Sequence, residues 1–308
     1  MKFFKLIRYQ NLLLLALMQL IFRFGYLELI NIPLSLFYWQ YALLVGATVL
    51  IAAGGYVIND IFDQETDEEN KPDNVIIGKY ISEAKAYTIY AALTISGVIC
   101  GFILANSVSH PNFAVIFVLI ATLLYFYASM LKQIAVLGNV VVATLLAFSV
   151  LIIGVFDIFP NTFDFNRQQM SLAFAILWDY ALFAFMLNLA REIIKDIEDI
   201  NGDKNQGIRT LPVRTGSDLS AKIASGILFL SAGYIFYYIN KNLMESELYI
   251  SVAYLLALVI APIIFVAIKV WNAKESSEFH SASTILKWII FFGILSVTVI
   301  TLNIKYNA

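Results

Sequence analysis

Long apolar runs alternate with short polar segments along the whole chain. A helix needs about 20 apolar residues to cross the hydrocarbon core of a bilayer, and about nine runs have roughly that length. They predict membrane-spanning helices over 11–33, 37–62, 83–107, 112–131, 136–157, 171–198, 218–239, 249–271 and 285–304. The leucine-rich start resembles a signal peptide, but no small-residue cleavage site follows, so we interpret it as the first span. The pattern predicts an all-α, polytopic membrane bundle, a single domain over residues 1–308.

The composition agrees with a membrane setting. The chain is 60% hydrophobic and 14% charged, with a mean hydropathy of +0.79, whereas soluble domains are nearer half apolar and a quarter charged. The net charge of -2 gives no indication of nucleic-acid binding. The one cysteine, Cys100, excludes an intrachain disulfide and a zinc-cysteine site. Membrane lipids are the expected surroundings, and no obligate protein partner is evident.

The loop charges predict an orientation. With nine spans, most lysines and arginines fall on one side, including Lys269, Lys274 and Lys287, which we place between the eighth and ninth spans. Positive loops stay in the cytoplasm. We therefore expect the N-terminus and the ends of the second and sixth spans to face the cytoplasm, with the protein in the cell (inner) membrane. The segment 159–169 is expected on the other side.

Two acidic segments end two of the apolar runs. The first reads Asn-Asp-Ile-Phe-Asp-Gln-Glu-Thr-Asp over 59–67, and on a continuing helix Asn59, Asp63 and Asp67 share one face. In the second segment, Asp196, Asp199 and Asp203 also share a face. Converging carboxylates need a countercharge, and hard divalent cations prefer oxygen ligands. Facing clusters would hold Mg²⁺ ions and, through them, a diphosphate; the alternative is two solvated helix ends.

Polar and basic residues accompany these acids. Cations beside a metal site suit a polyanionic substrate, because they bind the phosphate oxygens that the metal does not. Taken singly, each basic residue also fits the ordinary excess of positive charge in cytoplasmic loops. The candidates for substrate binding are Arg8, Asn11, Lys132, Arg191, Lys195 and Arg209.

The two acidic segments resemble the signatures of a known family. Asn59-Asp60-x-x-Asp63-x-x-x-Asp67 is similar to the first motif of the UbiA-type intramembrane prenyltransferases, and Asp199-x-x-x-Asp203, preceded by Asp196, to their second. The resemblance covers nearly the whole chain and implies nine helices around a central cavity, with two Mg²⁺ ions that bridge the diphosphate. It implies catalytic roles for Asp63, Asp67, Asp199 and Asp203, with Asn59 and Asp196 as further metal ligands.

A finer resemblance is to the digeranylgeranylglyceryl phosphate synthase branch, through 190–203 and Thr210-Leu211-Pro212. It implies Mg²⁺-dependent transfer of a geranylgeranyl group from an allylic diphosphate donor to a lipophilic acceptor, geranylgeranylglyceryl phosphate, which would form an ether lipid precursor. The family often has two basic-proline pairs after the first motif. Here Lys71-Pro72 fits the first, Asn74-Val75 replaces the second, and Lys79 is the candidate to supply the missing phosphate contact.

Two other functions stay open at this stage. An aromatic acceptor in quinone or haem synthesis would use the same metal chemistry but would need fewer basic groups. A cation-coupled transporter would place its acids in the middle of spans, where Asp179 is the main candidate.

Overall fold

The computed structural model describes residues 2–70 and 72–307. Within those residues nine helical segments are long and apolar enough to cross a membrane, which confirms the predicted all-α bundle. The α-helices are α1 (Lys2–Leu6), α2 (Tyr9–Phe22), α3 (Tyr38–Phe62), α4 (Gln64–Asn70), α5 (Glu83–Ser107), α6 (Ala114–Ser129), α7 (Leu137–Ile153), α8 (Arg167–Glu198), α9 (Ile200–Asn205), α10 (Leu211–Thr215), α11 (Ser217–Tyr238), α12 (Tyr249–Leu255), α13 (Ala261–Asn272) and α14 (Ser276–Asn307).

Shorter helical segments extend or connect these helices. Four π-helical segments continue neighbouring spans: η1 (Arg23–Leu27), η5 (Gly154–Ile158), η7 (Ile239–Met244) and η8 (Leu256–Ile260). Four 3₁₀ turns lie in connections: η2 (Pro72–Asn74), η3 (Pro111–Phe113), η4 (Leu131–Gln133) and η6 (Phe159–Asn161). The π-helical segment η8 has an identifiable cause. Pro262, at the start of α13, has no backbone N–H to donate to the preceding turn, and the wider π-turn accommodates the missing hydrogen bond.

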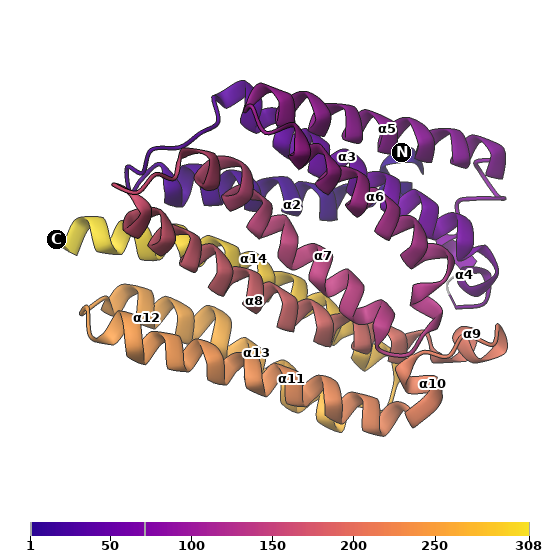
Figure 1. The fold of residues 1–308 in the computed structure, drawn as a ribbon. Helices are drawn as coiled ribbons and strands as arrows, with labels where there is room; N and C mark the ends of the chain where they lie inside the picture. The colour runs from indigo at the N-terminus through magenta and orange to yellow at the C-terminus, as the bar shows by residue number, and fades with distance from the viewer. Residues whose placement is uncertain (1, 71, 308) are drawn as a thin grey trace.

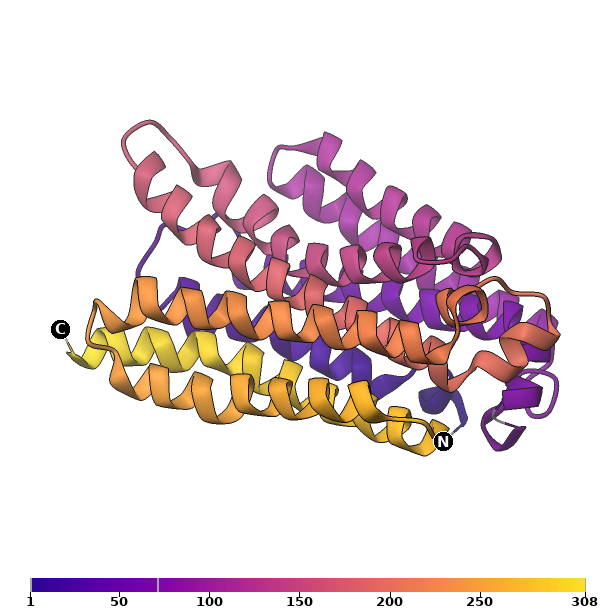
Figure 2. The ribbon, with the colours of Figure 1, turned by 90° about the horizontal axis from the view of Figure 1, so that it is seen from below.

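The helices run side by side along one direction, and α4, α9 and α10 lie together at one end of the bundle (Figure 1). The C-terminus lies at the opposite end, as the view from below also shows (Figure 2). The long helix α8 packs against α7, α11 and α14, and α3 packs most extensively against α5. Close approach of α3 and α5 depends on Gly97, because a Cβ there would lie 3.1 Å from the Ala47 carbonyl oxygen.

The two largest differences from the predicted bounds are in the first and last spans. The first span ends at Leu27 rather than at 33, and the last begins at Ser276 rather than at 285. The stretch after Ser276 is too polar for a hydropathy window to detect, although it is helical. Lys287, which the sequence analysis counts among the loop charges although the predicted ninth span includes it, lies well inside α14. This correction changes the interpretation of the central cavity.

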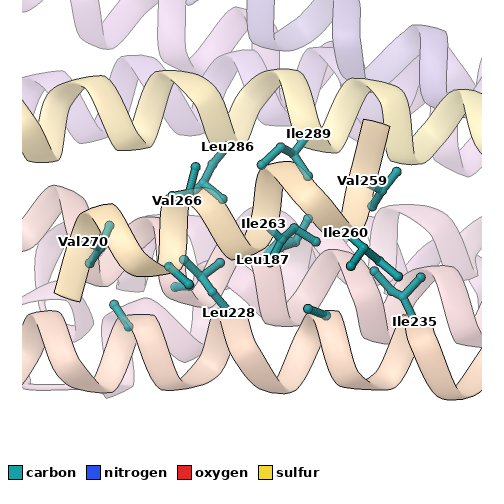
Figure 3. Close-up of a cluster of buried hydrophobic side chains, with 14 of the residues drawn as sticks. Leu187, Leu228, Ile235, Val259, Ile260, Ile263, Val266, Val270, Leu286 and Ile289 are labelled. Carbon is teal, nitrogen blue, oxygen red and sulfur yellow. The ribbon is translucent and has the colours of Figure 1, made fainter. Parts of the chain in front are cut away.

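The interior is apolar and closely packed, as bundle interiors are. In the C-terminal half, side chains such as Leu187, Leu228, Ile263 and Leu286 from α8, α11, α13 and α14 interdigitate (Figure 3). Many large apolar side chains, including Leu172, Trp178 and Phe265, are instead exposed on the outer surface. Large apolar side chains on the outside of long apolar helices are what a lipid environment requires, so the protein is an integral membrane protein.

One charged pair is buried at the end of the bundle that lies away from α4 and α9. The guanidinium of Arg23, in η1, forms an ion pair with Asp157, in η5, and donates a hydrogen bond to the Leu36 carbonyl at 2.7 Å. Asp157 also accepts a hydrogen bond from the Leu36 N–H at 2.9 Å. Both side chains are almost completely buried. The pair joins the first span to the fifth.

Candidate active site

Each acidic motif straddles a junction between a long helix and a short one. Asp63 separates α3 from α4 with φ/ψ of -95° and 5°, and Asp199 separates α8 from α9 with φ/ψ of -97° and 9°. The backbone hydrogen bond to the residue four positions earlier survives at both junctions, at 2.9 Å for Asp63 and 3.0 Å for Asp199. The helical spacing that we predicted for the motifs therefore persists across a local break.

The two short helices contact each other, which brings the two motifs together. Asn70, at the end of α4, donates a hydrogen bond to the Asp199 carbonyl at 3.1 Å and accepts one from the Gly202 N–H at 3.0 Å. A Cβ on Gly202 would lie only 2.4 Å from the Asn70 amide nitrogen, so a larger residue there would displace the amide. At the outer edge, the Asn205 amide donates a hydrogen bond to Glu69.

Asp60 and Asp196, which lie three residues before the junctions, are each held by a residue at the start of a span. That span is the first span of the chain in the N-terminal half and the fifth in the C-terminal half. In the N-terminal half, Arg8 forms an ion pair with Asp60 at 2.8 Å. In the C-terminal half, Asn139 of α7 donates a hydrogen bond to Asp196 at 2.7 Å. The same position is therefore held by a cation in one half and by a neutral amide in the other.

Two further motif carboxylates, Asp63 and Asp203, also have polar partners. Asp63 accepts a hydrogen bond from the Asn59 amide at 2.6 Å and forms an ion pair with Lys132, which the turn η4 carries to this end of the bundle. Asp203 accepts a hydrogen bond from the Thr210 hydroxyl at 3.1 Å. Lys132, like Arg8, is thus a predicted basic residue that lies directly against the first motif.

The electrostatics confirm that the motifs face each other. Burial, together with the nearby charges of Asp63, Asp60 and Asp199, raises the pKa of Asp67 to about 6. Burial also raises the pKa of Asp203 to about 6; the Thr210 hydrogen bond opposes this shift, and Asp199 and Asp63 add to it. Each motif therefore experiences the negative charge of the other.

This donor set fits a hard divalent cation. Carboxylate and amide oxygens are the ligands that Mg²⁺ takes, and the contact between the two motifs brings several of them to the same end of the bundle. In the part of the chain that the structure describes, no three histidine, cysteine, aspartate or glutamate side chains converge on one point as they stand. Asp63 is engaged by Lys132 and Asp196 by Asn139, so these carboxylates would exchange partners when they ligate an ion.

The other predicted substrate-binding residues fall into different places. Asn11 and Arg191 line a central cavity, and Lys195 forms an ion pair with Glu192 at 2.8 Å rather than with a motif aspartate. Lys79 lies on the surface, 3.1 Å from the Pro72 carbonyl oxygen, and Arg209 is exposed. Lys71 lies outside the described residues.

The central cavity has a volume of about 970 Å³ including its open mouth. Asn11, Asn188, Arg191 and Lys287 give it one polar end, and apolar side chains of α2, α7, α8 and α14 form most of the rest. A smaller cavity adjoins it, where Asp179 accepts a hydrogen bond from Tyr234 at 2.7 Å. A cavity that is polar at one end and apolar along its length suits a lipid with a charged head group.

Sequence reasoning missed several residues of this site. Asn70, Asn139 and Thr210 hold or bridge the motifs, and Lys287 lines the cavity. Thr210 belongs to a segment that resembles the family, but no rule of spacing assigns a partner to Thr210 or to Asn139. A lysine inside a span would have been a signal, because intramembrane charges are expensive and generally functional.

The sequence and the fold are similar to those of known proteins. Residues 24–296 match the UbiA prenyltransferase family. The digeranylgeranylglyceryl phosphate synthase of Saccharolobus solfataricus is 35% identical over 274 residues, which cover 88% of this chain and 85% of that protein. The enzyme of the same name from Methanosphaera stadtmanae is 33% identical over 256 residues, covering 81% of this chain and 84% of that protein.

Solved structures share the fold. A structure of digeranylgeranylglyceryl phosphate synthase superimposes with a TM-score of 0.65 at 23% identity and covers 97% of both chains. A UbiA homologue from Archaeoglobus fulgidus bound to GPP and Mg²⁺ superimposes with a TM-score of 0.56 at 15% identity, covering 96% of this chain and 99% of that one. The family match, the sequence identity and the shared fold agree: the chain belongs to the UbiA prenyltransferase family.

Proposed function

We propose that the protein transfers a geranylgeranyl group from its diphosphate to the free hydroxyl of geranylgeranylglyceryl phosphate, which forms an ether. The observation that carries this proposal is the contact between the two aspartate motifs through Asn70 at one end of the bundle. The curated relatives that match most of the chain are synthases of digeranylgeranylglyceryl phosphate, which supports the choice of acceptor.

In this proposal Asp63, Asp67, Asp199 and Asp203 ligate two Mg²⁺ ions, with Asn59 and Asp196 as further ligands. Bound divalent ions supply positive charge to the diphosphate as it leaves. Lys132, already at Asp63, exchanges its carboxylate partner for a diphosphate oxygen. The apolar walls of the cavity keep water away from the allylic carbon, so that the acceptor hydroxyl rather than water forms the new C–O bond.

The proposed orientation places α4, α9 and the mouth of the cavity on the cytoplasmic side of the cell (inner) membrane. The uneven distribution of loop lysines and arginines supports this orientation. Labelling of single cysteines in a Cys100→Ala background tests it. Labelling of position 73 from outside intact cells would contradict it.

The test of the reaction uses purified protein in detergent with Mg²⁺, labelled geranylgeranyl diphosphate and a panel of acceptors. We expect an ether product with geranylgeranylglyceryl phosphate and none when EDTA removes the metal. Faster turnover with 4-hydroxybenzoate or a naphthoate would reject the glycerol acceptor but retain prenyl transfer.

A further inference from the structure

Lys287 is a charged residue inside a membrane-spanning helix. Contacts between α8 and α14 fix its height in the bundle: His280 contacts Glu198 at 3.1 Å, and the Arg191 Nε donates a hydrogen bond to the Ser283 carbonyl at 3.4 Å. The two helices run antiparallel, so Lys287, one turn beyond Ser283, lies level with Arg191 and the turn that precedes it. Both cations line the same cavity.

The charges around Lys287 are unbalanced in favour of positive charge. It lies within electrostatic range of Arg191, Lys195 and Arg8, and of one carboxylate, Glu192. Arg8 is paired with Asp60, and Glu192 is shared by Lys195 and Arg191 at 2.8 and 3.5 Å. Lys195 also lies within electrostatic range of Asp196, so Arg191, Lys195 and Lys287 together face two carboxylates, which leaves a formal excess of one positive charge among these groups.

Lys287 also lacks a structural partner. Across residues 2–70 and 72–307, no hydrogen bond or ion pair joins its ammonium group to another side chain or to the backbone. Its side chain lines the cavity but keeps much of its surface exposed. A cation that costs free energy in the membrane and stabilises no neighbour is available for an anionic ligand.

The cavity behind these cations is apolar. Its walls beyond the polar end are formed by Leu14, Leu15, Met18, Phe22, Val150 and Ile294. The cavity thus offers a cationic end to a phosphate and an apolar length to an isoprenoid chain. An aromatic carboxylate would leave most of that length unfilled.

The cationic end is separate from the aspartate motifs. Along α8, Arg191 precedes Asp196 by five residues, a rise of about 7.5 Å, and the junction residue Asp199 by eight residues, a rise of about 12 Å. Lys132 is the cation that contacts a motif carboxylate at Asp63, whereas Arg191 and Lys287 lie deeper in the bundle. The diphosphate of the donor and the phosphate monoester of the acceptor could therefore bind at two separate sites.

We propose that Lys287 and Arg191 bind the phosphate monoester of the acceptor and thereby determine its selection; this rests on the proposed function. Lys287 binds directly through its ammonium group, and Arg191 offers the guanidinium that is not fully used by Ser283 and Glu192. The donor diphosphate is held elsewhere, by the metal ions and Lys132.

The experiment compares Lys287→Gln with Lys305→Gln, a matched lysine that is exposed at the far end of the same helix. Turnover is measured with geranylgeranylglyceryl phosphate and with the same acceptor without its phosphate. For Lys287→Gln we expect the KM of the phosphorylated acceptor to rise roughly ten- to a hundredfold, as for loss of one charged hydrogen bond. The KM of the donor and that of the dephosphorylated acceptor should change less than about twofold. Lys287→Arg should restore most of the affinity.

A binding measurement separates the two anion sites without turnover. Because the proposed phosphate site contains no metal, EDTA should leave binding of the phosphorylated acceptor to the wild-type protein unchanged and abolish binding of the donor. Lys287→Gln should weaken acceptor binding in EDTA by the same factor as in Mg²⁺.

Other outcomes overturn the proposal in distinguishable ways. An equal loss with both acceptors would make Lys287 a structural residue, and a rise in the donor KM alone would place it at the diphosphate. If the wild-type protein prenylates neither glycerol acceptor but does prenylate an aromatic one, the proposed function itself fails.

Discussion

The two halves of the active site have the same backbone and different electrostatics. In both halves an aspartate caps the junction between a long and a short helix, with nearly equal φ and ψ. The N-terminal half pairs two of its carboxylates with cations, Asp60 with Arg8 and Asp63 with Lys132. The C-terminal half holds two of its carboxylates with neutral donors, Asn139 at Asp196 and Thr210 at Asp203.

This difference shows what the fold requires and what it leaves variable. The helix junction recurs because it determines where the aspartates point, while the charge of the supporting residue differs between halves. Neutral donors add no positive charge, so the carboxylates that they hold are offset by a proton or a metal ion rather than by a lysine or arginine. We therefore expect that removal of a proposed metal ligand reduces turnover equally in both halves. Removal of a residue that supports a carboxylate should have a different effect in each half.

The largest expected effect is equal in both halves. Asp63→Ala and Asp199→Ala should each reduce turnover by more than about a thousandfold, because each removes a carboxylate that we propose to bind the metal ions that hold the leaving diphosphate. Turnover is measured at saturating Mg²⁺, and thermal unfolding in detergent checks that each variant folds. Full activity in either variant, or in EDTA, would disprove the metal site.

A smaller loss of turnover is expected when the hydrogen bonds between α4 and the second motif are removed. Asn70→Ala removes both hydrogen bonds between α4 and the second motif, and we expect turnover to fall roughly ten- to a hundredfold because ligand positions loosen. Asn205→Ala is the matched control, since its contact with Glu69 is exposed, and it should change turnover less than about twofold. Equal effects of the two substitutions would show that the inner bridge has no special role.

The free energy of unfolding should fall more when the neutral residue Asn139 is replaced than when the charged residue Arg8 is replaced. Asn139→Leu leaves the Asp196 carboxylate without its donor in a buried environment and should cost about 1–3 kcal/mol of unfolding free energy. Arg8→Met breaks an ion pair whose arginine side chain is 37% exposed, so screening limits the cost to about 1 kcal/mol. Thermal unfolding of both variants in the same detergent compares the two losses of stability. A larger loss for Arg8→Met than for Asn139→Leu would contradict the prediction.

The smallest expected effect concerns Mg²⁺ affinity. Arg8→Gln removes a positive charge beside the first motif, so the Mg²⁺ concentration for half-maximal activity should fall about threefold. Asn139→Leu changes no charge beside the second motif and should leave that concentration within experimental error. An increase in the Mg²⁺ requirement of Arg8→Gln would mean that Arg8 supports ligand geometry rather than opposing the metal charge.

Much of the fold was predictable because it depends on the length and periodicity of apolar runs. Apolar runs predict the spans, and the spacing of the carboxylates predicts both motifs. The structure confirms nine spans among its described residues. Lys287 was misplaced because α14 begins with polar residues that a hydropathy pattern assigns to a loop. Asn70 and Asn139 were missed because their partners lie 129 and 57 residues away along the chain, and no local pattern predicts such pairings.

The buried pair of Arg23 and Asp157 has a consequence for biosynthesis. The two residues are 134 positions apart, and Arg23 enters the membrane with the first span, long before Asp157 has been synthesised. Until the fifth span arrives, the carboxylate available to Arg23 is that of Glu28, five residues later and 3.2 Å away, which is about one-third exposed. Asp157, which is completely buried, adds the second carboxylate only when the fifth helix docks. Docking of the fifth helix is therefore the step that completes the buried polar cluster at this end of the bundle.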